Sequence, residues 1–195
     1  MGNQTGNSEW DKDLVKKVLG GDTNAFRHII QQSEGLVAQM VSRMIIHAED
    51  RKDIVQDIYM KAFHKLAEFR FQSKLVTWIG RIAYNTCINW MEKKKLYLPG
   101  DLHDDMHDMP GVADKRNSSE AVMMQKELSG ILKKTLDELP PVYQTLVVMY
   151  HQEELSYADM MEITGLPEGT IKNYLFRARR ALRDDLLKRY DKEDL

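Results

Sequence analysis

The sequence predicts an all-α protein in which two small helical domains are joined by a flexible acidic linker. Through most of the chain, apolar residues recur three or four positions apart, as on one face of a helix, and no alternating stretch is long enough for a sheet. Over 96–119 this pattern gives way to prolines, glycines and acidic residues. We therefore expect one domain over 10–95, a linker over 96–119 and a second domain over 120–195 that contains a helix-turn-helix.

The composition excludes several classes of protein. A chain of 195 residues with 43% hydrophobic content is large and apolar enough to form one or two globular domains. No apolar run approaches the roughly 20 residues needed to cross a bilayer, and the N-terminus lacks a signal-peptide pattern, so we expect a cytoplasmic protein. The single cysteine, Cys87, excludes an internal disulfide and a cysteine-based zinc site, and its helical surroundings predict a core position.

The first domain is predicted to be a bundle of helices. The first helix covers 10–19 and ends at a pair of glycines, which break helices. Asp22 or Thr23 can cap the second, because a short polar side chain accepts hydrogen bonds from the free N–H groups of the first turn. Asp50 opens the third helix, and the fourth covers 77–91.

An aromatic and basic loop, FRFQSKL over 69–75, joins the third and fourth helices. Its rings allow two interpretations. Phe69 and Phe71 can fill the core, as phenylalanines usually do. Alternatively, with Trp78 and Asn85 on the next helix, they can contact bases that leave a duplex, and each stacked base contributes about 1–3 kcal/mol.

The linker contains histidines and carboxylates in a pattern that is compatible with a metal site. His103, Asp104, His107 and Asp108 are spaced as ligands on one helical face would be. Prolines and glycines on both sides, and the absence of cysteine, favour a solvated acidic tether instead. We therefore expect no metal, no cofactor and no small-molecule substrate.

In the second domain, two prolines mark the boundary between two helices. A serine can cap a helix over 120–136, which the sequence Leu-Pro-Pro at 139–141 ends. Pro141 suits the first position of the next helix, over 142–150, because that position needs no N–H donor.

The stretch from Ser156 to Arg183 predicts a helix-turn-helix. Ser156 can cap the first helix, Gly165 permits the turn, and Pro167 fixes the start of the second helix. The inner residues of the first helix are expected to be Ala158, Met161 and Ile163. Those of the second helix are expected to be Ile171, Leu175, Ala178 and Leu182.

The opposite face of the second helix carries side chains that suit DNA: Lys172, Asn173, Arg177 and Arg180. Asn can bond an adenine edge and Arg a guanine edge, so this helix is suited to lie in a major groove. An ordinary helical hairpin with a solvated basic face is the alternative interpretation.

Charge is unevenly distributed, although the net charge is only −2. Residues 61–95 carry eight basic and two acidic side chains, and residues 168–190 carry seven basic and three acidic ones. Between these blocks, residues 99–120 carry six acidic and two basic side chains. Since local potential attracts phosphate, two basic blocks separated by an acidic one predict two nucleic-acid-facing modules on a tether.

Four motifs follow one another in a specific order. The first domain contains DIVQDIYMKAFHKL and TWIGRIAYNTCINWMEKKK, and the second contains LDELPPVYQTLVVMY and SYADMMEITGLPEGTIKNYLFRARRALR. In this order they resemble an extracytoplasmic-function (ECF) sigma factor, group 4 of the bacterial primary-type sigma family. The resemblance covers about 21–95 and 120–190. It implies a subunit without catalytic activity that docks on core RNA polymerase and directs promoter recognition, DNA melting and transcription initiation.

The resemblance also implies partners for three sets of residues. Asp53, Gln56 and Asp57 are expected to bind the clamp helices of the largest polymerase subunit, while the second domain meets the flap of the second largest. The residues expected at the minus-ten element, where a non-template base is flipped out, are Phe69, Arg70, Phe71, Lys74, Trp78, Arg81 and Asn85. The residues expected to bind the minus-thirty-five element are Thr170, Lys172, Asn173, Tyr174, Arg177 and Arg180.

An anti-sigma factor, wedged between the two modules, is a further partner that the resemblance implies. The chain departs from common family members where FRFQSKLV replaces a Gly- or Ser-rich acidic stretch, and where Gly80 replaces a bulkier residue.

Two other functions are alternatives to that of a sigma factor. The first is a helix-turn-helix regulator that binds a palindrome as a dimer, and the second is a metal-dependent hydrolase that uses the linker histidines and aspartates.

Overall fold

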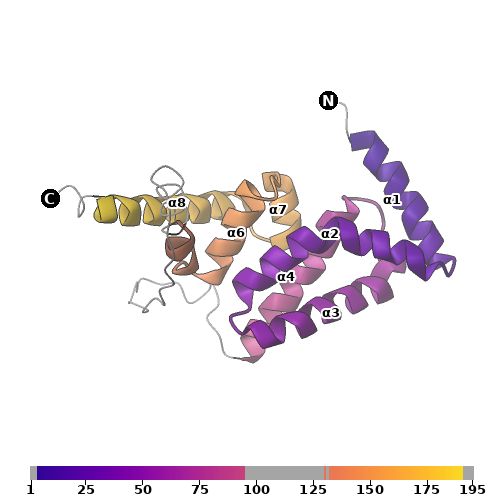
Figure 1. The fold of residues 1–195 in the computed structure, drawn as a ribbon. Helices are drawn as coiled ribbons and strands as arrows, with labels where there is room; N and C mark the ends of the chain where they lie inside the picture. Colours follow the sequence, from indigo (N-terminus) through magenta and orange to yellow (C-terminus); the bar gives the residue numbers. More distant parts are fainter. Residues whose placement is uncertain (1–3, 95–129, 131, 191–195) are drawn as a thin grey trace, which may run out of the picture.

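The structure, a computed structural model, describes residues 4–94, 130 and 132–190. Every regular element in these residues is a helix, which confirms the all-α class, and two helical regions are separated by 95–129 (Figure 1). No helix in the described part of the chain is both long and apolar enough to span a membrane. The predicted linker, with His103, Asp104, His107 and Asp108, and most of the helix predicted over 120–136 lie outside the described residues.

The first helical region consists of α1 (Gln4–Leu19), α2 (Thr23–Met44), α3 (Ala48–Lys65), a short 3₁₀ turn (Leu66–Glu68) and α4 (Leu75–Lys93). α2 lies at its centre and packs against the other three α-helices. α1, α3 and α4 begin two to six residues earlier than predicted. Their first turns are mostly polar or lie on a loop, so apolar periodicity alone did not include them.

Asp22 caps α2, as predicted. Its side chain accepts hydrogen bonds from the backbone N–H groups of Asn24 at 3.0 Å and Ala25 at 3.3 Å. The cap fixes the start of the helix, and the apolar stripe that follows, including Ile29 and Val37, is buried.

The second helical region contains a helical segment over 132–137, followed by α6 (Pro141–His151), α7 (Tyr157–Thr164) and α8 (Glu168–Tyr190). Pro141 occupies the first turn of α6, as predicted. The amide of the buried Gln144 donates hydrogen bonds to the carbonyl oxygens of Asp137 at 3.1 Å and Leu139 at 2.7 Å. These bonds satisfy acceptors at the chain reversal before α6, where the prolines supply no N–H donors.

The helix-turn-helix forms from α7 and α8. The Ser156 hydroxyl accepts the Asp159 N–H at 3.1 Å, and Gly165 takes the left-handed conformation with φ 72°, so the predicted cap and turn are both confirmed. The inner residues predicted for α7 were wrong in part. Ile163 is buried, but Met160 fills the second inner position, whereas Ala158 and Met161 are exposed.

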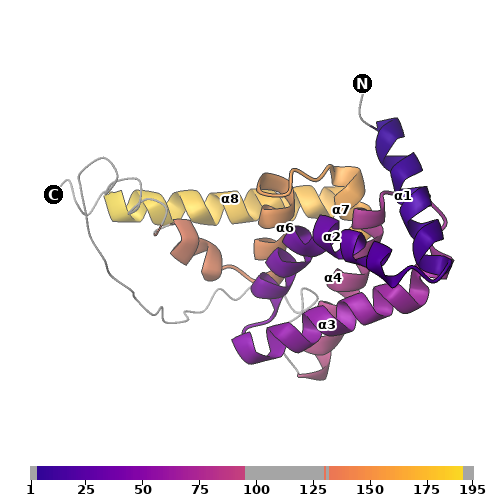
Figure 2. The same cartoon turned by 45° about the vertical axis from the view of Figure 1, so that its right-hand side comes forward.

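The apolar face of α8 is turned inward, as predicted. Ile171, Leu175 and Ala178 are fully buried, and Leu182 is partly buried. The C-terminal end of α8 extends away from α1–α4 (Figure 2). The N-terminal half of α8 is therefore the part that is fixed by the core.

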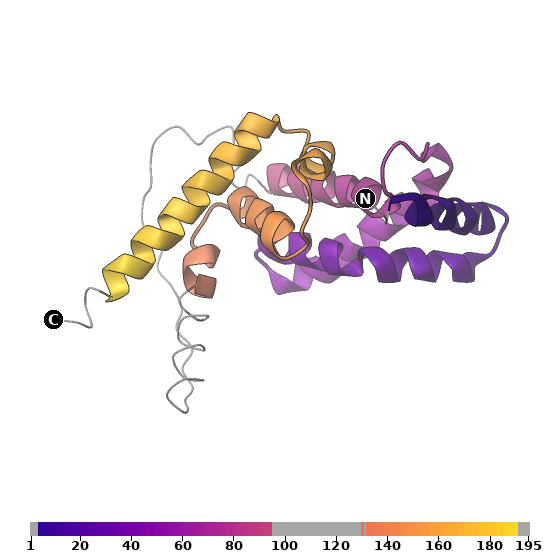
Figure 3. The same cartoon turned by 90° about the horizontal axis from the view of Figure 1, so that it is seen from above.

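The two helical regions pack against each other and share one apolar core. α6 lies on α2, and α7 lies on α4. From above, α7 lies between α4 and α8 (Figure 3). The sequence predicted the two regions but not this contact, because periodicity shows which residues are buried without showing what covers them.

Candidate nucleic-acid interface

The outward face of α8 carries the predicted DNA contacts. Lys172, Asn173, Arg177 and Arg180 are exposed, on the opposite side of the helix from Ile171 and its buried neighbours. The orientation follows from the packing, because burial of the apolar face leaves these four side chains no other direction.

Some of these side chains already have acidic partners. Lys172 Nζ lies 2.6 Å from Glu168 Oε1, and this hydrogen bond and charge raise the pKa of Lys172. Arg180 Nε lies 3.6 Å from Asp184 Oδ2. Both pairs are solvent-exposed and one helical turn apart, so a phosphate can replace the carboxylate at little cost.

Asn173 and Arg177 are the two side chains on this face that are free to bond. Within the part of the chain that the structure describes, neither has a side-chain hydrogen bond or ion pair. Asn and Arg can each bond a base edge in two places.

Thr170 and Tyr174 are placed differently from the other predicted contacts. Thr170 lies in the first turn of α8 and is half-buried. Tyr174 is also half-buried, with its ring 4.6 Å from that of Tyr143 on α6. Burial and, to a lesser extent, the neighbouring Tyr174 raise the pKa of Tyr84, on α4, to about 12. Tyr174 thus packs on α6 and lies near Tyr84 of α4.

Phe176 is an exposed residue on α8 that the sequence analysis missed. It is 61% exposed, the second most exposed large apolar side chain that the structure describes. With Arg179, Arg180 and Arg183 it lines a hollow of about 430 Å³ along the helix. The signal was present in the sequence, since these four positions share one helical face.

The loop between α3 and α4 holds a row of three aromatic rings. The Phe69 ring lies 4.7 Å from that of Phe71 and 5.3 Å from that of Trp78. Phe69 is 6% exposed and Phe71 is 37% exposed. The core-filling interpretation is therefore correct for Phe69, while Phe71 and the partly buried Trp78 keep ring surface in reach of solvent.

α4 continues this surface along one helical face. Trp78, Arg81 and Asn85 are spaced by three and four residues, and the two polar side chains are exposed. Arg70 on the loop is exposed as well. The predicted minus-ten residues thus lie along the loop and the face of α4 that follows it, with Phe69 as the buried residue among them.

At the start of α4 the second helical region covers part of this surface. The Thr77 hydroxyl donates to Asp159 Oδ1 of α7 at 3.1 Å, and Lys74 Nζ lies 3.5 Å from Asp159 Oδ2. Burial is the largest influence on the pKa of Asp159 and raises it. The Ser156 hydroxyl, Lys74 and Thr77 outweigh it together and hold the pKa below its usual value.

Gly80 allows α7 to approach α4 closely. A Cβ atom at this position would lie 3.1 Å from Cδ1 of Ile163 and 3.1 Å from Cδ2 of Leu36. Those separations are too short for carbon atoms in ordinary contact. The glycine is therefore explained by the close approach of two helices at this point of α4, α7 from the second region and α2 from the first.

A second carboxylate, from α1, holds the first turn of α4. Asp11 Oδ2 accepts the Leu75 N–H at 3.3 Å, and the Asp11 residue is only 5% exposed. Burial raises the pKa of Asp11, although the bond from the Leu75 N–H lowers it. Lys74, at the cap position, makes no such bond with its own side chain, so a residue distant in sequence supplies the cap.

The predicted polymerase-binding residues lie on the outer face of α3. Asp53, Gln56 and Asp57 are exposed, and Asp57 Oδ2 lies 2.7 Å from Lys61 Nζ. Met60 extends the same face and is 52% exposed, which the sequence analysis missed. An acidic face with an exposed apolar residue is suited to a protein partner.

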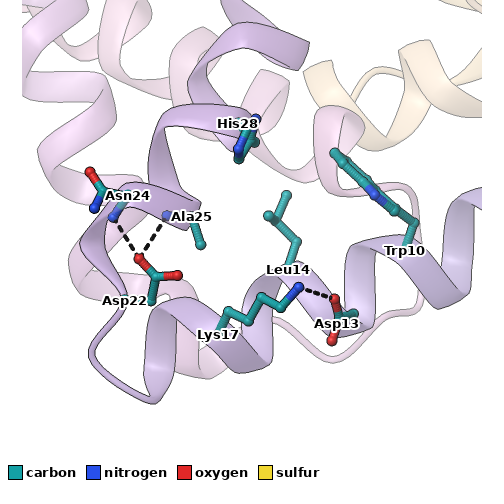
Figure 4. A pocket seen from close by; sticks show the side chains of 8 residues that line it. All are labelled: Trp10, Asp13, Leu14, Lys17, Asp22, Asn24, Ala25 and His28. Atoms are coloured by element: carbon teal, nitrogen blue, oxygen red, sulfur yellow. Dashed lines mark hydrogen bonds and ion pairs between the residues drawn. The ribbon is translucent and has the colours of Figure 1, made fainter.

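A hollow of about 400 Å³ lies between α1 and the start of α2 (Figure 4). Its polar side chains already have partners within α1 and α2, because Asp22 caps α2 and Asp13 Oδ2 lies 2.7 Å from Lys17 Nζ.

In the described residues, no three His, Cys, Asp or Glu side chains are grouped to hold a metal ion. Cys87 is buried as predicted, and burial raises its pKa to about 12, so the thiol stays protonated.

Family models match both helical regions. The model for sigma-70 region 2 matches 29–96, and the model for sigma-70 region 4 matches 129–182. The first match contains the aromatic loop and α4, and the second contains the helix-turn-helix. These regions define a sigma factor of the sigma-70 type, which is a non-enzymatic subunit of RNA polymerase.

Relatives that match along almost the whole chain identify the class of sigma factor. The ECF RNA polymerase sigma-E factor of Haemophilus influenzae is 31% identical over 180 residues, which are 90% of this chain and 95% of that protein. The ECF RNA polymerase sigma-E factor of Escherichia coli is 30% identical over 176 residues, which are 88% and 92% of the two chains. The chain belongs to the ECF sigma factors, which direct transcription initiation and bind DNA through region 4.

Solved structures share the fold. CnrH, in complex with the cytosolic domain of CnrY, has a TM-score of 0.60 and 20% identity over 90% of this chain and 96% of that one. The sigma factor RpoE of Bartonella quintana, in complex with the anti-sigma factor NepR, has a TM-score of 0.59 and 23% identity over 83% and 96%. The likeness therefore extends over both helical regions of the chain.

Proposed function

We propose that this sigma factor binds two spaced promoter elements and core polymerase through the three surfaces described above. The exposed face of α8 binds the minus-thirty-five element. The loop over 69–74 and α4 capture the separated strand at the minus-ten element. The division of α8 into a buried apolar face and an exposed polar face supports this proposal most directly.

The residues on α8 have different roles in this proposal. Asn173 and Arg177 contact base edges, since they are free and can form paired hydrogen bonds. Lys172 and Arg180 contact phosphates, which position the helix without carrying sequence information. Thr170 and Tyr174 belong to the same contact surface, with Tyr174 held in place by Tyr143.

Melting requires no chemical step. Taking a base out of the stack costs a few kcal/mol, which a stacking surface and nearby cations can offset. Phe71 and Trp78 offer ring surface, while Arg70, Lys74, Arg81 and Asn85 offer polar groups, and Phe69 anchors the loop. Binding the unpaired strand better than the duplex favours the open state.

Protein partners complete the proposal. Asp53, Gln56 and Asp57 bind the clamp helices of the largest polymerase subunit, and the second helical region binds the flap of the second largest. The chain acts in the cytoplasm, where polymerase works. Because the solved RpoE sigma factor, which shares this fold, is bound to the anti-sigma factor NepR, a comparable partner is proposed here too.

The decisive experiment is co-purification with core RNA polymerase, followed by transcription from promoters that the holoenzyme selects from random DNA. A Gln56→Ala, Asp57→Lys double variant should lose core binding, while Glu34→Lys, an exposed change on α2, should retain it. Failure of the wild-type chain to bind core polymerase would contradict the proposal. Tight binding of a palindrome without polymerase would support a dimeric regulator instead.

The melting role needs its own measurement. Trp78→Ala should reduce open-complex formation, followed by permanganate reactivity of unpaired thymines, far more than it reduces binding to the closed duplex. Unchanged open-complex formation in this variant would remove strand capture from the proposal.

A further inference from the structure

We infer that Tyr157 is a positioning residue for DNA binding: the face of its ring holds the Lys172 ammonium group in place for a phosphate of the minus-thirty-five element. Tyr157 belongs to α7, so it lies outside the set of DNA contacts predicted on α8. The inference rests on the proposed function, in which Lys172 contacts a phosphate. It adds the residue that fixes this contact before DNA arrives.

The Lys172 ammonium group has two neighbours. Its Nζ atom lies 2.6 Å from Oε1 of Glu168, one turn earlier on α8, and 5.2 Å from the centroid of the Tyr157 ring. A cation within about 6 Å of an aromatic centroid is attracted by the negative face of the ring. Because lysine carries its charge on a long, flexible stem, these two neighbours determine where the charge lies.

The Tyr157 ring is itself held in place by the fold. Tyr157 is the first residue of α7, directly after the Ser156 cap, and it is half-buried. Its ring lies 5.4 Å from that of Tyr150 on α6, with an angle of 31° between the rings. Tyr150 is half-buried too, and the His151 ring meets it edge-on at 4.9 Å. The cap and α6 therefore fix the ring, and the ring presents a face to a side chain of α8.

The two neighbours of Lys172 differ in how they act on a phosphate. The Glu168 carboxylate repels the phosphate and occupies the same ammonium group, so it has to be displaced. Both side chains of this pair are half-exposed, so the pair is weak and its displacement costs little.

The neutral ring of Tyr157, in contrast, neither repels a phosphate nor has to leave when the phosphate binds. The contact between the ring and the ammonium group can therefore persist in the complex with DNA. A side chain whose freedom is restricted before binding loses less entropy during binding. Tyr157 thus strengthens the phosphate contact without touching the DNA.

Two other roles for Tyr157 lead to different expectations. If the Tyr157 hydroxyl donates a hydrogen bond to a phosphate itself, the oxygen is needed. If the ring only packs on Tyr150, Lys172 is not needed. Positioning requires the ring and Lys172 together, and it does not require the hydroxyl.

The test measures binding of the holoenzyme to a promoter that it has selected. Tyr157→Leu removes the aromatic face and should weaken binding about 2- to 5-fold, the range expected for an exposed contact between a cation and a ring. Tyr157→Phe is the matched control, because it keeps the ring and should bind like the wild type. A loss in Tyr157→Phe as large as that in Tyr157→Leu would assign the contact to the hydroxyl and overturn the inference.

The dependence of binding on salt supplies a readout that a purely structural role would not change. Each phosphate contact made by a lysine adds about one unit to the slope of log affinity against log salt concentration. Lys172→Met should lower the slope by about one unit, and Tyr157→Leu should lower it part of the way. Weaker binding of Tyr157→Leu with the slope of the wild type would contradict the inference.

A double-mutant cycle tests whether the ring acts through the lysine. In the Lys172→Met background, Tyr157→Leu should cause no further loss of affinity, because the ammonium group that the ring positions is gone. A further loss as large as that in the wild-type background would show that the ring acts without Lys172, and the inference would fail.

Glu168→Gln tests the other neighbour of the ammonium group. This variant should bind the promoter no more weakly than the wild type and up to about twofold more tightly, since it removes a competing anion and leaves the ring in place. The substitution is on the surface, so it tests the inference even if Tyr157→Leu fails to fold. Weaker binding would show that the carboxylate positions Lys172 and would overturn the inference.

Lys172→Met also separates this inference from the proposed function. If this variant keeps the affinity and the salt slope of the wild type while Arg177→Ala weakens binding, the inference fails and binding by α8 stands. If both variants bind like the wild type, the proposed binding of DNA by α8 fails as well.

Discussion

The two DNA-facing helices, α8 and α4, have similar side chains but different accessibility. On α8, Asn173 and Arg177 are exposed and free of partners in the described part of the chain. At the start of α4, Lys74 and Thr77 are held by Asp159 from the other helical region. Composition alone thus does not show which surface is free to bind DNA. Packing against a segment distant in the sequence determines whether the surface is covered.

The start of α4 also brings together two carboxylates with opposite behaviour. Asp11 is buried against one N–H donor, so burial dominates and raises its pKa. Asp159 is also partly buried, but the Ser156 hydroxyl, Lys74 and Thr77 together lower its pKa. Opposite shifts imply opposite dependences of stability on pH, which makes the two residues separable by experiment.

The largest expected effect comes from breaking the covered contact. Ile163→Ala should lower the free energy of unfolding by about 2–5 kcal/mol, because Ile163 is 1% exposed and contacts α4 at Gly80. Urea unfolding measures this free energy. Met161→Ala, two residues away and 38% exposed, should change the free energy of unfolding by less than about 0.5 kcal/mol. Equal effects would mean that the inner face of α7 is wrongly assigned.

A substitution on the exposed face of α8 should weaken DNA binding without lowering the stability of the fold. Arg177→Ala should weaken holoenzyme binding to a selected promoter by about 1–3 kcal/mol and relax the preference at one base pair. The free energy of unfolding, measured in urea, should change by less than about 0.5 kcal/mol, since Arg177 is exposed. Binding selections on randomised minus-thirty-five DNA test the base preference. A uniform loss on all sequences would identify a phosphate contact instead.

Asp159 should make stability fall in acid. A carboxyl group with a lowered folded-state pKa stabilises the fold above its ordinary value of 3.8, and this contribution disappears as the pH falls through the folded pKa. Wild type should therefore be more stable than Asp159→Asn near neutral pH, and the difference should shrink below about pH 4. Urea midpoints measured across this range check it. Parallel curves would show that the charge of Asp159 makes no contribution.

The smallest effect is expected at Asp11, with the opposite sign. Its pKa is raised, so the ionised form destabilises the fold and the penalty disappears as the pH falls through the folded pKa towards 3.8. Asp11→Asn keeps an oxygen acceptor for the Leu75 N–H and should be slightly more stable than wild type near neutral pH. The gain should vanish in acid. A less stable variant at all pH values would show that the carboxylate itself is needed.

Local signals in the sequence predicted the second helical region well. Ser156, Gly165 and Pro141 each act through their own backbone or the next turn, so their roles can be identified without knowing the fold. α7 shows the limit of this approach. In a helix of eight residues, more than one apolar face can be drawn through Ala158, Met160, Met161 and Ile163. Contact with α4, α8 and α6 buries Met160 and Ile163.

Contacts between distant segments were not predictable. Asp11 caps α4 across 64 residues of sequence, and Asp159 contacts Thr77 across 82. Neither carboxylate differs in its local sequence from an ordinary surface residue. The aromatic loop was similarly ambiguous, because burial of Phe69 and exposure of Phe71 depend on the ring of Trp78 in the next helix.

Asp159 has two structural roles at once, and this limits how the protein can change. Its backbone N–H and carboxylate both bond the Ser156 hydroxyl, at 3.1 Å and 2.6 Å, so the residue helps to begin the helix-turn-helix. The same carboxylate contacts α4. A mutation here therefore weakens the DNA-binding motif together with the contact, whereas a side chain at position 80 would meet both Ile163 of α7 and Leu36 of α2. The contact between the two regions therefore cannot be altered at Asp159 without also altering the start of α7.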